Sequence, residues 1–336
     1  AEACILETVL LSIYNFDSAI AAAASRMTAM AEGRPCAEMG SRRTHEWAAV
    51  GAARAAYIAG FSATSNLEAG RTYGIPTMGT AAHSFTLLHD SEEAAFQAQL
   101  NTLGVETTLL VDTYDVEAAI RKGVELTEGR LGAIRLDSGD LPMMARQARD
   151  LLDDLGATNT RITVTSDLDE WQIAALRGAP VDGFGVGTSL VTGSGHPTCG
   201  FVYKLVARSD SADREAPMTP VGKKSKGKNT LGGRKFAMRR LGENGRAEAE
   251  IIGLGAAPVG DDNDRNLLVD LVKDGQQVFQ GSLEDARTRH RESLAELPLA
   301  ALRISRGDPA IETIILDGTG AQTTNPYQAA PRSANL

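Results

Sequence analysis

The chain has 336 residues and a formal net charge of −9, and this acidic balance argues against nucleic acid as a partner. Its length suits an α/β barrel of roughly 250 residues with a smaller appended region. Its cysteines (Cys4, Cys36 and Cys199) are scattered and no uncharged apolar stretch reaches about eighteen residues, so we expect a cytoplasmic protein without disulfides, structural zinc or a membrane span.

The first segment has the pattern of a helix from its start. Apolar side chains recur at three- and four-residue spacing over residues 3–32, which predicts one or two helices broken near Asn15-Phe16-Asp17. No capping or initiation signal precedes Ile5, so we expect the chain to begin inside a longer protein.

Short strand-like runs then alternate with helical patterns. The strand-like runs are Cys36–Met39, Ile75–Thr80, Thr107–Thr113, Ala133–Asp137, Ile162–Ser166, Gly183–Gly187 and Phe201–Val206. The helical patterns cover residues 45–59, 91–103, 115–127, 141–155 and 168–177. This alternation predicts a parallel sheet, and the number of strand candidates favours closure into an irregular, TIM-like (β/α) barrel.

The character of the chain changes after about residue 207, where polar, charged and glycine-rich sequence replaces the alternation. Short β-like pieces occur at Phe236–Arg240 and Ile251–Gly255, and a last helix is predicted over about 283–296. We therefore expect a barrel core with entry helices, a basic, β-rich segment of a second, smaller domain, and a C-terminal helical region with a polar tail. Their bounds are 1–206, 207–260 and 261–336.

Two motifs at the ends of strand-like runs combine residues suited to catalysis. In Gly79-Thr80-Ala81-Ala82-His83-Ser84-Phe85, small neighbours leave the His83 ring accessible as a base or phosphoryl acceptor, although a lone histidine in a turn is more often structural. The carboxylates of Arg135-Leu136-Asp137-Ser138-Gly139-Asp140 suit ribose hydroxyls or hydrated Mg²⁺, and the alternative is ion pairing on a barrel rim. Asp112 either orients His83 or caps the following helix.

Further motifs are suited to binding anions. In Gly183-Phe184-Gly185-Val186-Gly187-Thr188-Ser189, backbone N–H groups and a hydroxyl can converge on a phosphate beside Ser166-Asp167, although a plain turn is the alternative. Gly40-Ser41-Arg42-Arg43 suits a bidentate carboxylate clamp or a surface ion-pair network. The stretch Gly222–Asn229 is a near miss of an ATP-binding P-loop, which we reject because Asn229 replaces the required Ser or Thr.

Taken in this order, the motifs resemble nicotinate phosphoribosyltransferase, a family of type II phosphoribosyltransferases. The resemblance runs from about residue 3 to 300 and is most specific at Gly40–Arg43, Ala55–Thr80, the His83 turn, Arg135–Asp140 and Phe184–Thr188. It implies an enzyme of NAD salvage that forms nicotinate mononucleotide and pyrophosphate from nicotinate and phosphoribosyl pyrophosphate. This pentosyl transfer, formally a C–N ligase reaction, is coupled to ATP hydrolysis through a phosphohistidine and uses Mg²⁺. The resemblance also implies a homodimer with sites shared between subunits.

The resemblance, together with the motifs above, gives each residue an expected role. His83 would carry the phosphoryl group, with Asp112, Arg135 and Asp137 as the other catalytic residues and Asp137 in indirect contact with Mg²⁺. The expected substrate-binding residues are Arg42, Ser65, Thr80 and Asp140. The expected 5′-phosphate cradle comprises Ser166, Gly185, Gly187 and Thr188. Ser65 stands where the nicotinamide-specific enzyme carries an aspartate, which favours nicotinate as the substrate.

The chain also departs from the family pattern. Most of the family's β-rich N-terminal domain is expected to be missing from this chain, including the aromatic residue that stacks on the pyridine ring of a neighbouring subunit. Met39 stands where relatives have an aromatic residue. The alternatives are a quinolinate- or nicotinamide-type phosphoribosyltransferase, or a catalytically silent barrel subunit.

Overall fold

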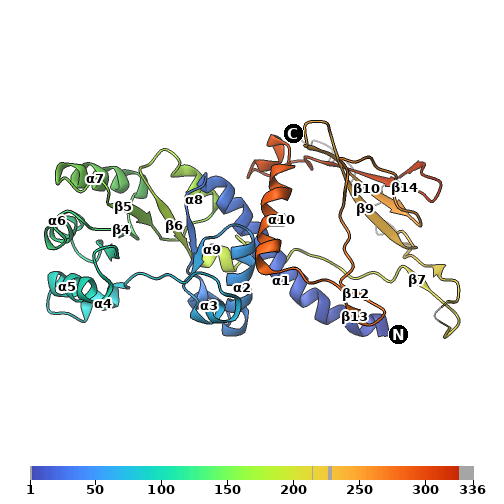
Figure 1. Cartoon of the computed structure of the whole chain (residues 1–336), viewed down its shortest axis with the longest axis horizontal. Coiled ribbons are helices and arrows are strands. Elements are labelled where there is room, and N and C mark those ends of the chain that lie inside the picture. The colour runs from blue at the N-terminus through green and yellow to red at the C-terminus, as the bar shows by residue number, and fades with distance from the viewer. Residues whose placement is uncertain (1, 214, 226–228, 325–336) are drawn as a thin grey trace. The chain divides into compact units, whose positions relative to one another are not determined.

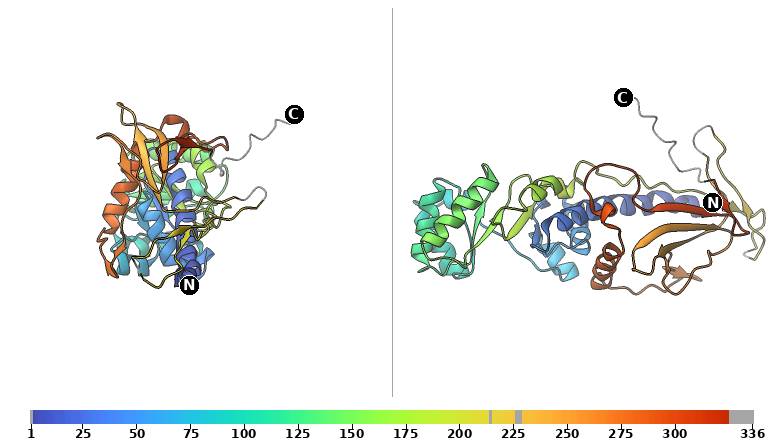
Figure 2. Two further views of the ribbon diagram at one scale, coloured as in Figure 1. Left: turned by 90° about the vertical axis from the view of Figure 1, so that its right-hand side faces the viewer. Right: turned by 90° about the horizontal axis from the view of Figure 1, so that it is seen from above.

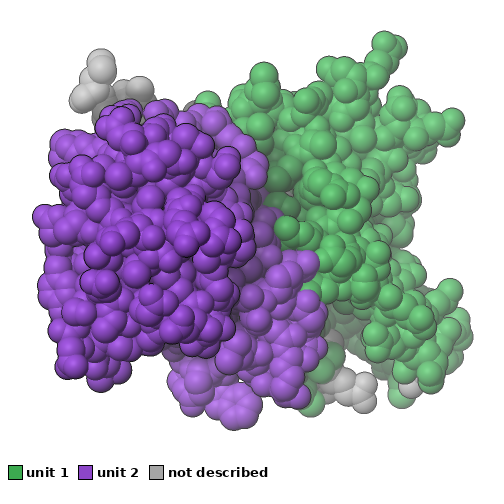
Figure 3. Space-filling model, turned by 60° about the vertical axis from the view of Figure 1, so that its left-hand side comes forward, with its two compact units in different colours: residues 1–13, 201–336 green, residues 14–200 purple. Residues whose placement is uncertain are grey.

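The computed structural model describes residues 2–213, 215–225 and 229–324. The chain folds as two compact units, of which unit 1 is Ala1–Ile13 with Phe201–Leu336, and unit 2 is Tyr14–Gly200 (Figure 3). Part of the Gly222–Asn229 stretch and the end of the polar tail, residues 226–228 and 325–336, lie outside the described residues.

Unit 2 is an α/β fold built on a parallel sheet (Figure 1). Its strands are β1 (Cys36–Glu38), β2 (Ala63–Thr64), β3 (Thr108–Leu110), β4 (Ala133–Leu136), β5 (Arg161–Val164) and β6 (Gly183–Val186). They lie in the order β2-β1-β6-β5-β4-β3, and each pair of neighbours is parallel. The described strands thus form a half-barrel with β2 and β3 at its edges, and closure into a TIM-like barrel stays a prediction.

Helices follow the strands and cover the sheet. The helices with residues in unit 2 are α1 (Glu2–Ala31), η1 (Ser41–Arg43), α2 (Glu46–Ile58), α3 (Leu67–Tyr73), α4 (His83–Leu87), α5 (Glu92–Leu103), α6 (Val116–Leu126), α7 (Leu141–Asp154), α8 (Glu170–Ala175) and α9 (Thr188–Val191). Several begin at a side-chain cap, since Ser91, Asp115 and Asp169 each accept an N–H from the first turn. Figures 1 and 2 show α5, α6 and α7 side by side near β4 and β5.

The structure confirms every helix predicted between residues 45 and 177 and the predicted strands at β1, β3, β4, β5 and β6. The predicted break at Asn15-Phe16-Asp17 is wrong, because α1 runs through it and Asp17 pairs with Arg54 instead of ending a helix. Only Thr77 of the Ile75–Thr80 run pairs, through one isolated bridge to the short strand β2. Phe201–Val206 is not a strand, since no described strand pairs with it and several of its apolar side chains are exposed.

The core of unit 2 lies between the sheet and its helices. Leu109, Ile134, Leu136 and Ile162 are fully buried, as expected of parallel strands covered on both faces. Arg135 is the one residue of β4 that is only partly buried, so a charged side chain leaves an otherwise apolar strand. Arg135 thus places a charged side chain near the carboxyl end of the sheet.

Unit 1 is built on a mixed sheet with the order β11-β9-β10-β14-β15. Its elements are β7 (Ala207–Arg208), β8 (Thr219–Pro220), β9 (Lys235–Leu241), β10 (Ala247–Leu254), β11 (Arg265–Asn266), β12 (Val272–Lys273), β13 (Gln276–Gln277), α10 (Leu283–Ala295), η2 (Leu299–Leu302), β14 (Glu312–Leu316) and β15 (Gln322–Thr323). Met238, Ala249 and Ile251 form its small core. The two β pieces and the last helix expected from the sequence are confirmed as β9, β10 and α10.

The length and apolar composition of helix α1 are relevant to the prediction that the chain has no membrane span. By length and composition alone, its stretch Cys4–Ala31 is apolar enough to cross a membrane. This is weak evidence because core helices meet the same criterion, and within unit 2 the second half of α1 buries Ile20, Ala24 and Met27.

Candidate active site

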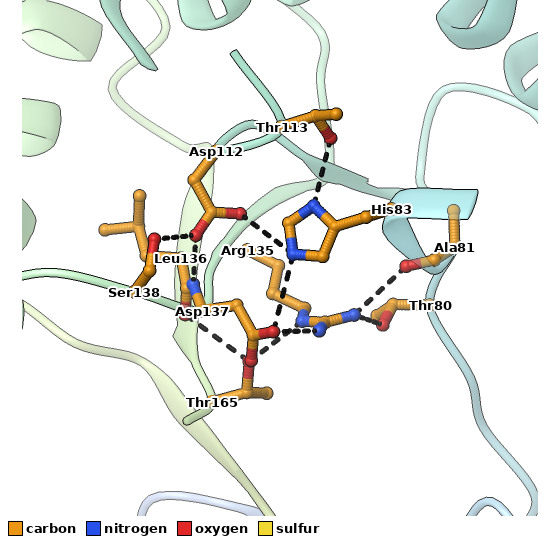
Figure 4. A network of polar contacts seen from close by, with 10 residues as sticks. All are labelled: Thr80, Ala81, His83, Asp112, Thr113, Arg135, Leu136, Asp137, Ser138 and Thr165. Carbon is orange, nitrogen blue, oxygen red and sulfur yellow. Dashed lines mark hydrogen bonds and ion pairs between the residues drawn. The ribbon is translucent and has the colours of Figure 1, made fainter. Parts of the chain in front are cut away.

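Polar side chains from several strand ends meet at the carboxyl edge of the unit 2 sheet (Figure 4). Arg135 lies in β4 and Asp137 directly follows it, while Asp112 and Thr113 follow β3. His83 is the first residue of α4. In α/β barrels this edge is where catalytic residues gather.

Arg135 is the centre of this cluster, with a side chain that is 11% exposed. Its Nε donates to Thr165 Oγ1 at 2.9 Å, and Nη1 donates to Thr80 Oγ1 at 2.6 Å and to the Ala81 carbonyl at 3.0 Å. Its Nη2 lies 3.0 Å from Asp137 Oδ2. The guanidinium fork is therefore fixed by Thr165, directly after strand β5, on one side and by the loop before His83 on the other.

Asp137 is held as a carboxylate. Oδ1 accepts a short hydrogen bond from the Thr165 hydroxyl, and Oδ2 faces Arg135. Burial alone would raise the pKa of Asp137, but the Thr165 hydrogen bond and the Arg135 charge together lower the pKa below its ordinary value of 3.8. Asp137 therefore carries its negative charge at neutral pH.

The His83 ring is 41% exposed and faces both carboxylates. Its Nδ1 lies 3.2 Å from Thr113 Oγ1. Its Nε2 lies 3.9 Å from Asp112 Oδ1 and 3.6 Å from Asp137 Oδ2. The ring is thus reachable from solvent, as the small neighbours in the sequence led us to expect.

Asp112 is almost fully buried, with 2% of its side chain exposed. Its Oδ2 accepts hydrogen bonds from the Asp137 N–H at 2.9 Å and from the Ser138 hydroxyl at 2.6 Å. Its Oδ1 has no hydrogen-bond partner among the described residues. The capping alternative for Asp112 is wrong, because Asp115 is the residue that caps α6.

Two of the expected substrate-binding residues lie at the other half of the same sheet edge. Arg42 is in η1 after β1, where its side chain is exposed and makes no hydrogen bond or ion pair with another described residue. Ser65 follows β2, and its N–H donates to the Glu38 carbonyl at 2.8 Å. Neither residue belongs to the hydrogen-bonded cluster around His83. Asp140 caps α7 by accepting from the Met143 N–H at 3.0 Å.

One glycine of the expected phosphate cradle, Gly185, packs closely against the cluster. A Cβ on Gly185 in β6 would lie 2.6 Å from Thr165 Cγ2 and 2.8 Å from Met39 Sδ. Gly187 precedes α9, which begins at Thr188. Ser166 has a φ of 86°, an uncommon conformation for a residue other than glycine. Thr165 thus contacts Asp137, Arg135 and the cradle strand together.

Sequence reasoning missed the two threonines that complete the cluster, Thr113 and Thr165. Thr113 ends the predicted strand run Thr107–Thr113 and Thr165 is the last residue but one of the run Ile162–Ser166, and this position is the one signal that could have found them. Threonine is common in strands for packing reasons, so that signal is not specific. Among the described residues, no group of three or more His, Cys, Asp or Glu side chains is arranged to hold a metal ion.

Comparison with known proteins gives clear relatives. No family model matches the chain. The nicotinate phosphoribosyltransferase pncB1 of Mycobacterium tuberculosis (strain CDC 1551 / Oshkosh) is 54% identical over 322 residues, which cover 93% of this chain and 70% of the relative. The crystal structure of human nicotinic acid phosphoribosyltransferase is similar with a TM-score of 0.74 and 25% identity, covering 92% of this chain and 74% of that one. A nicotinate-nucleotide pyrophosphorylase from Pyrococcus furiosus gives 0.73 and 25%, covering 87% and 73%.

Proposed function

The chain belongs to the nicotinate phosphoribosyltransferase family, enzymes that transfer a phosphoribosyl group to nicotinate, and from this premise we propose its reaction. It forms nicotinate mononucleotide and pyrophosphate from nicotinate and phosphoribosyl pyrophosphate, as a cytoplasmic step of NAD salvage. ATP is a co-substrate, hydrolysed through a phosphohistidine at His83. The observation that carries the proposal is the exposed His83 ring, which two carboxylates face on its Nε2 side.

The phosphorylation step follows from the surroundings of that ring. Asp112 and Asp137 place negative charge beside Nε2, which favours a proton on Nε2 and leaves the lone pair on Nδ1. Nδ1 attacks the γ-phosphorus of ATP, so an N–P bond forms while the bond from phosphorus to the bridging oxygen breaks and ADP leaves. The Thr113 hydroxyl frees Nδ1 for this step by rotating away. Water later cleaves the N–P bond and releases phosphate.

The transfer step replaces pyrophosphate by the nicotinate ring nitrogen at the anomeric carbon, through an oxocarbenium-like state. The Asp137 carboxylate stabilises the positive charge that develops on the ribose. Arg42 and Ser65 hold the nicotinate carboxylate, the guanidinium as a bidentate donor and the serine through its hydroxyl. An aspartate at position 65 would repel that carboxylate, so serine supports nicotinate over nicotinamide.

The remaining expected residues bind the sugar phosphate. Gly185 and Gly187 let the backbone pass close to Thr165 and Met39. The turn that follows binds the 5′-phosphate, with Thr188 and Ser166 supplying hydroxyl donors. Thr80 and Asp140 bind the ribose. Arg135 orients both Thr80 and Asp137.

When bound with the sugar substrate, Mg²⁺ would supply positive charge that neutralises the departing pyrophosphate. Both oxygens of Asp137 already have partners, Thr165 and Arg135, so this carboxylate would hold the ion through water molecules rather than directly. We also propose a homodimer with sites shared between subunits, which rests on the family resemblance.

Two kinds of alternative remain. The similarity to a nicotinate-nucleotide pyrophosphorylase makes a quinolinate-type transferase the first alternative. Such an enzyme needs no phosphorylated histidine, so the exposed His83 argues against it. Ser65 argues against a nicotinamide-type enzyme. The hydrogen-bonded cluster around Arg135 argues against a catalytically silent subunit.

One assay tests the proposal against these alternatives. Pyrophosphate release is measured with nicotinate, nicotinamide or quinolinate, each with and without ATP. We expect release with nicotinate that ATP stimulates, together with label from γ-labelled ATP on His83. Release with quinolinate alone, or no release with any acceptor, would overturn it.

A further inference from the structure

Glu38 is a buried carboxylate that the mechanism above does not use. It ends strand β1, and the residue is 1% exposed. Oε1 accepts from the Gly40 N–H and Oε2 accepts from the Thr64 hydroxyl, both in short hydrogen bonds. No described cation pairs with it. A buried carboxylate without a cation costs stability, and burial raises the pKa of Glu38 although the Thr64 and Gly40 hydrogen bonds oppose this.

The partners of Glu38 belong to the two segments that carry the nicotinate-binding residues. Gly40 leads into η1 and Arg42, and Thr64 precedes Ser65. The Ser65 N–H also donates to the Glu38 backbone carbonyl at 2.8 Å. Glu38 therefore fastens the Arg42 turn with one carboxylate oxygen and the Ser65 segment with the other.

A second set of contacts closes this link. The Thr64 Oγ1 accepts from the Asn66 N–H at 3.0 Å, and the Asn66 side-chain amide donates to Ser41 Oγ at 3.0 Å. The chain of bonds thus runs from Glu38 through Thr64 and Asn66 to Ser41, the residue next to Arg42. The two segments are joined at two points, which fixes their spacing.

Gly40 connects these hydrogen-bonded segments to the phosphate cradle. A Cβ at Gly40 would lie 2.3 Å from Val191 Cγ1 and 3.0 Å from the Gly187 carbonyl oxygen. The Arg42 turn therefore packs directly on the residues before and within α9. A displacement of Gly40 would alter the distance between the nicotinate and phosphate subsites.

We propose that Glu38 is a positioning residue that sets the spacing of Arg42 and Ser65, and through it the preference for a carboxylate on the pyridine ring. The inference rests on the proposed function, because it needs Arg42 and Ser65 to bind nicotinate. Glu38 itself touches no substrate. It acts by keeping both donors where one carboxylate can reach them.

The sharpest test uses a matched pair at Thr64, whose hydroxyl holds Glu38. Thr64→Val keeps the shape and removes the hydroxyl, whereas Thr64→Ser keeps the hydroxyl. We expect Thr64→Val to raise the KM for nicotinate about tenfold and to lower the nicotinate-to-nicotinamide preference, with the KM for phosphoribosyl pyrophosphate within about twofold. Thr64→Ser should remain near the wild type in each constant.

Further variants keep the test decisive if Thr64→Val does not fold. Glu38→Gln and Ser41→Ala loosen the same link, and both should shift the nicotinate KM in the same direction, Ser41→Ala less. Thermal unfolding and nicotinate affinity by calorimetry accompany the kinetics. Equal rises in both KM values, or a lower melting temperature with unchanged nicotinate affinity, would overturn the inference alone. A wild-type chain that neither binds nicotinate nor transfers would overturn the proposed function as well.

Discussion

The Oδ1 of Asp112, which accepts no hydrogen bond from any residue that the structure describes, faces Nε2 of His83 across 3.9 Å. The other oxygen of this carboxylate is fixed by the Asp137 N–H and the Ser138 hydroxyl. Its orientation is therefore set by the chain and does not depend on the histidine. Such a carboxylate stabilises one tautomer and one ring orientation of an imidazole, which is the support that a phosphorylated histidine needs.

Asp112→Asn tests this relationship, because it keeps the shape of the side chain and removes its charge. We expect phosphorylation of His83 to slow by about two to four orders of magnitude, as when the carboxylate of a histidine pair is neutralised. The rate at which label passes from γ-labelled ATP to the protein measures it. Ser138→Ala, which removes only one donor to Asp112, should slow labelling much less. Equal rates in Asp112→Asn and the wild type would exclude this role.

His83→Ala should abolish labelling and the stimulation of transfer by ATP, leaving weak transfer that ATP does not change. The reason is that the remaining cluster still holds the ribose and phosphate groups. Steady-state release of pyrophosphate with and without ATP provides the measurement. His89→Ala is the matched control, since the His89 ring bonds the Phe85 carbonyl and lies outside the cluster. Persistent ATP stimulation in His83→Ala would contradict the assignment.

The strands that carry this site could be predicted from the sequence, whereas the hydrogen bonds within the site could not. The apolar run before Arg135 predicts a strand end there, and the structure confirms it as β4. The pairing of Asp137 with Thr165 depends instead on the register of β4 and β5, in which Leu136 lies opposite Val164. A single sequence does not contain that register, so Thr165 and Thr113 could not be singled out.

The burial of Glu38 is a second feature that a single sequence does not reveal. In the sequence it ends a short strand and reads as an ordinary charged residue before the Gly40 turn. Only the fold brings Thr64 of β2 beside it, through the parallel pairing of Glu38 with Thr64. By contrast, the accessibility of His83 followed directly from its small neighbours.

The lowered pKa of Asp137 predicts how stability depends on pH. A carboxyl group whose pKa falls on folding contributes stability above its unfolded pKa and loses it as pH drops through the folded one. The wild type should therefore exceed Asp137→Asn in free energy of unfolding by about 1–3 kcal/mol above about pH 4. The difference should shrink at lower pH as Asp137 is protonated. Urea unfolding across the acid range measures this, and a gap that grows on acidification would refute it.

Ser65→Asp should change the preference between acid and amide substrates. The new carboxylate repels that of nicotinate and accepts from the amide of nicotinamide, so the ratio of kcat/KM values should move toward nicotinamide by about ten- to a hundredfold. Ser65→Ala is the control, because it removes the hydroxyl without adding charge and should weaken nicotinate only modestly. An unchanged ratio in Ser65→Asp would place Ser65 away from the pyridine carboxylate.

Gly185→Ala tests whether the cradle strand and the acidic cluster depend on one another. The added methyl group would lie 2.6 Å from Thr165 Cγ2, so Thr165 must move away from Asp137 and Arg135. Overpacking of this kind costs about 1–3 kcal/mol of stability, and the displaced threonine should lower kcat as well. Urea unfolding and steady-state kinetics report the two effects separately. Gly178→Ala is the control, since nothing lies within 4 Å of a Cβ at that position. If Gly185→Ala matched Gly178→Ala in both measurements, the contact between Gly185 and Thr165 would not constrain the site.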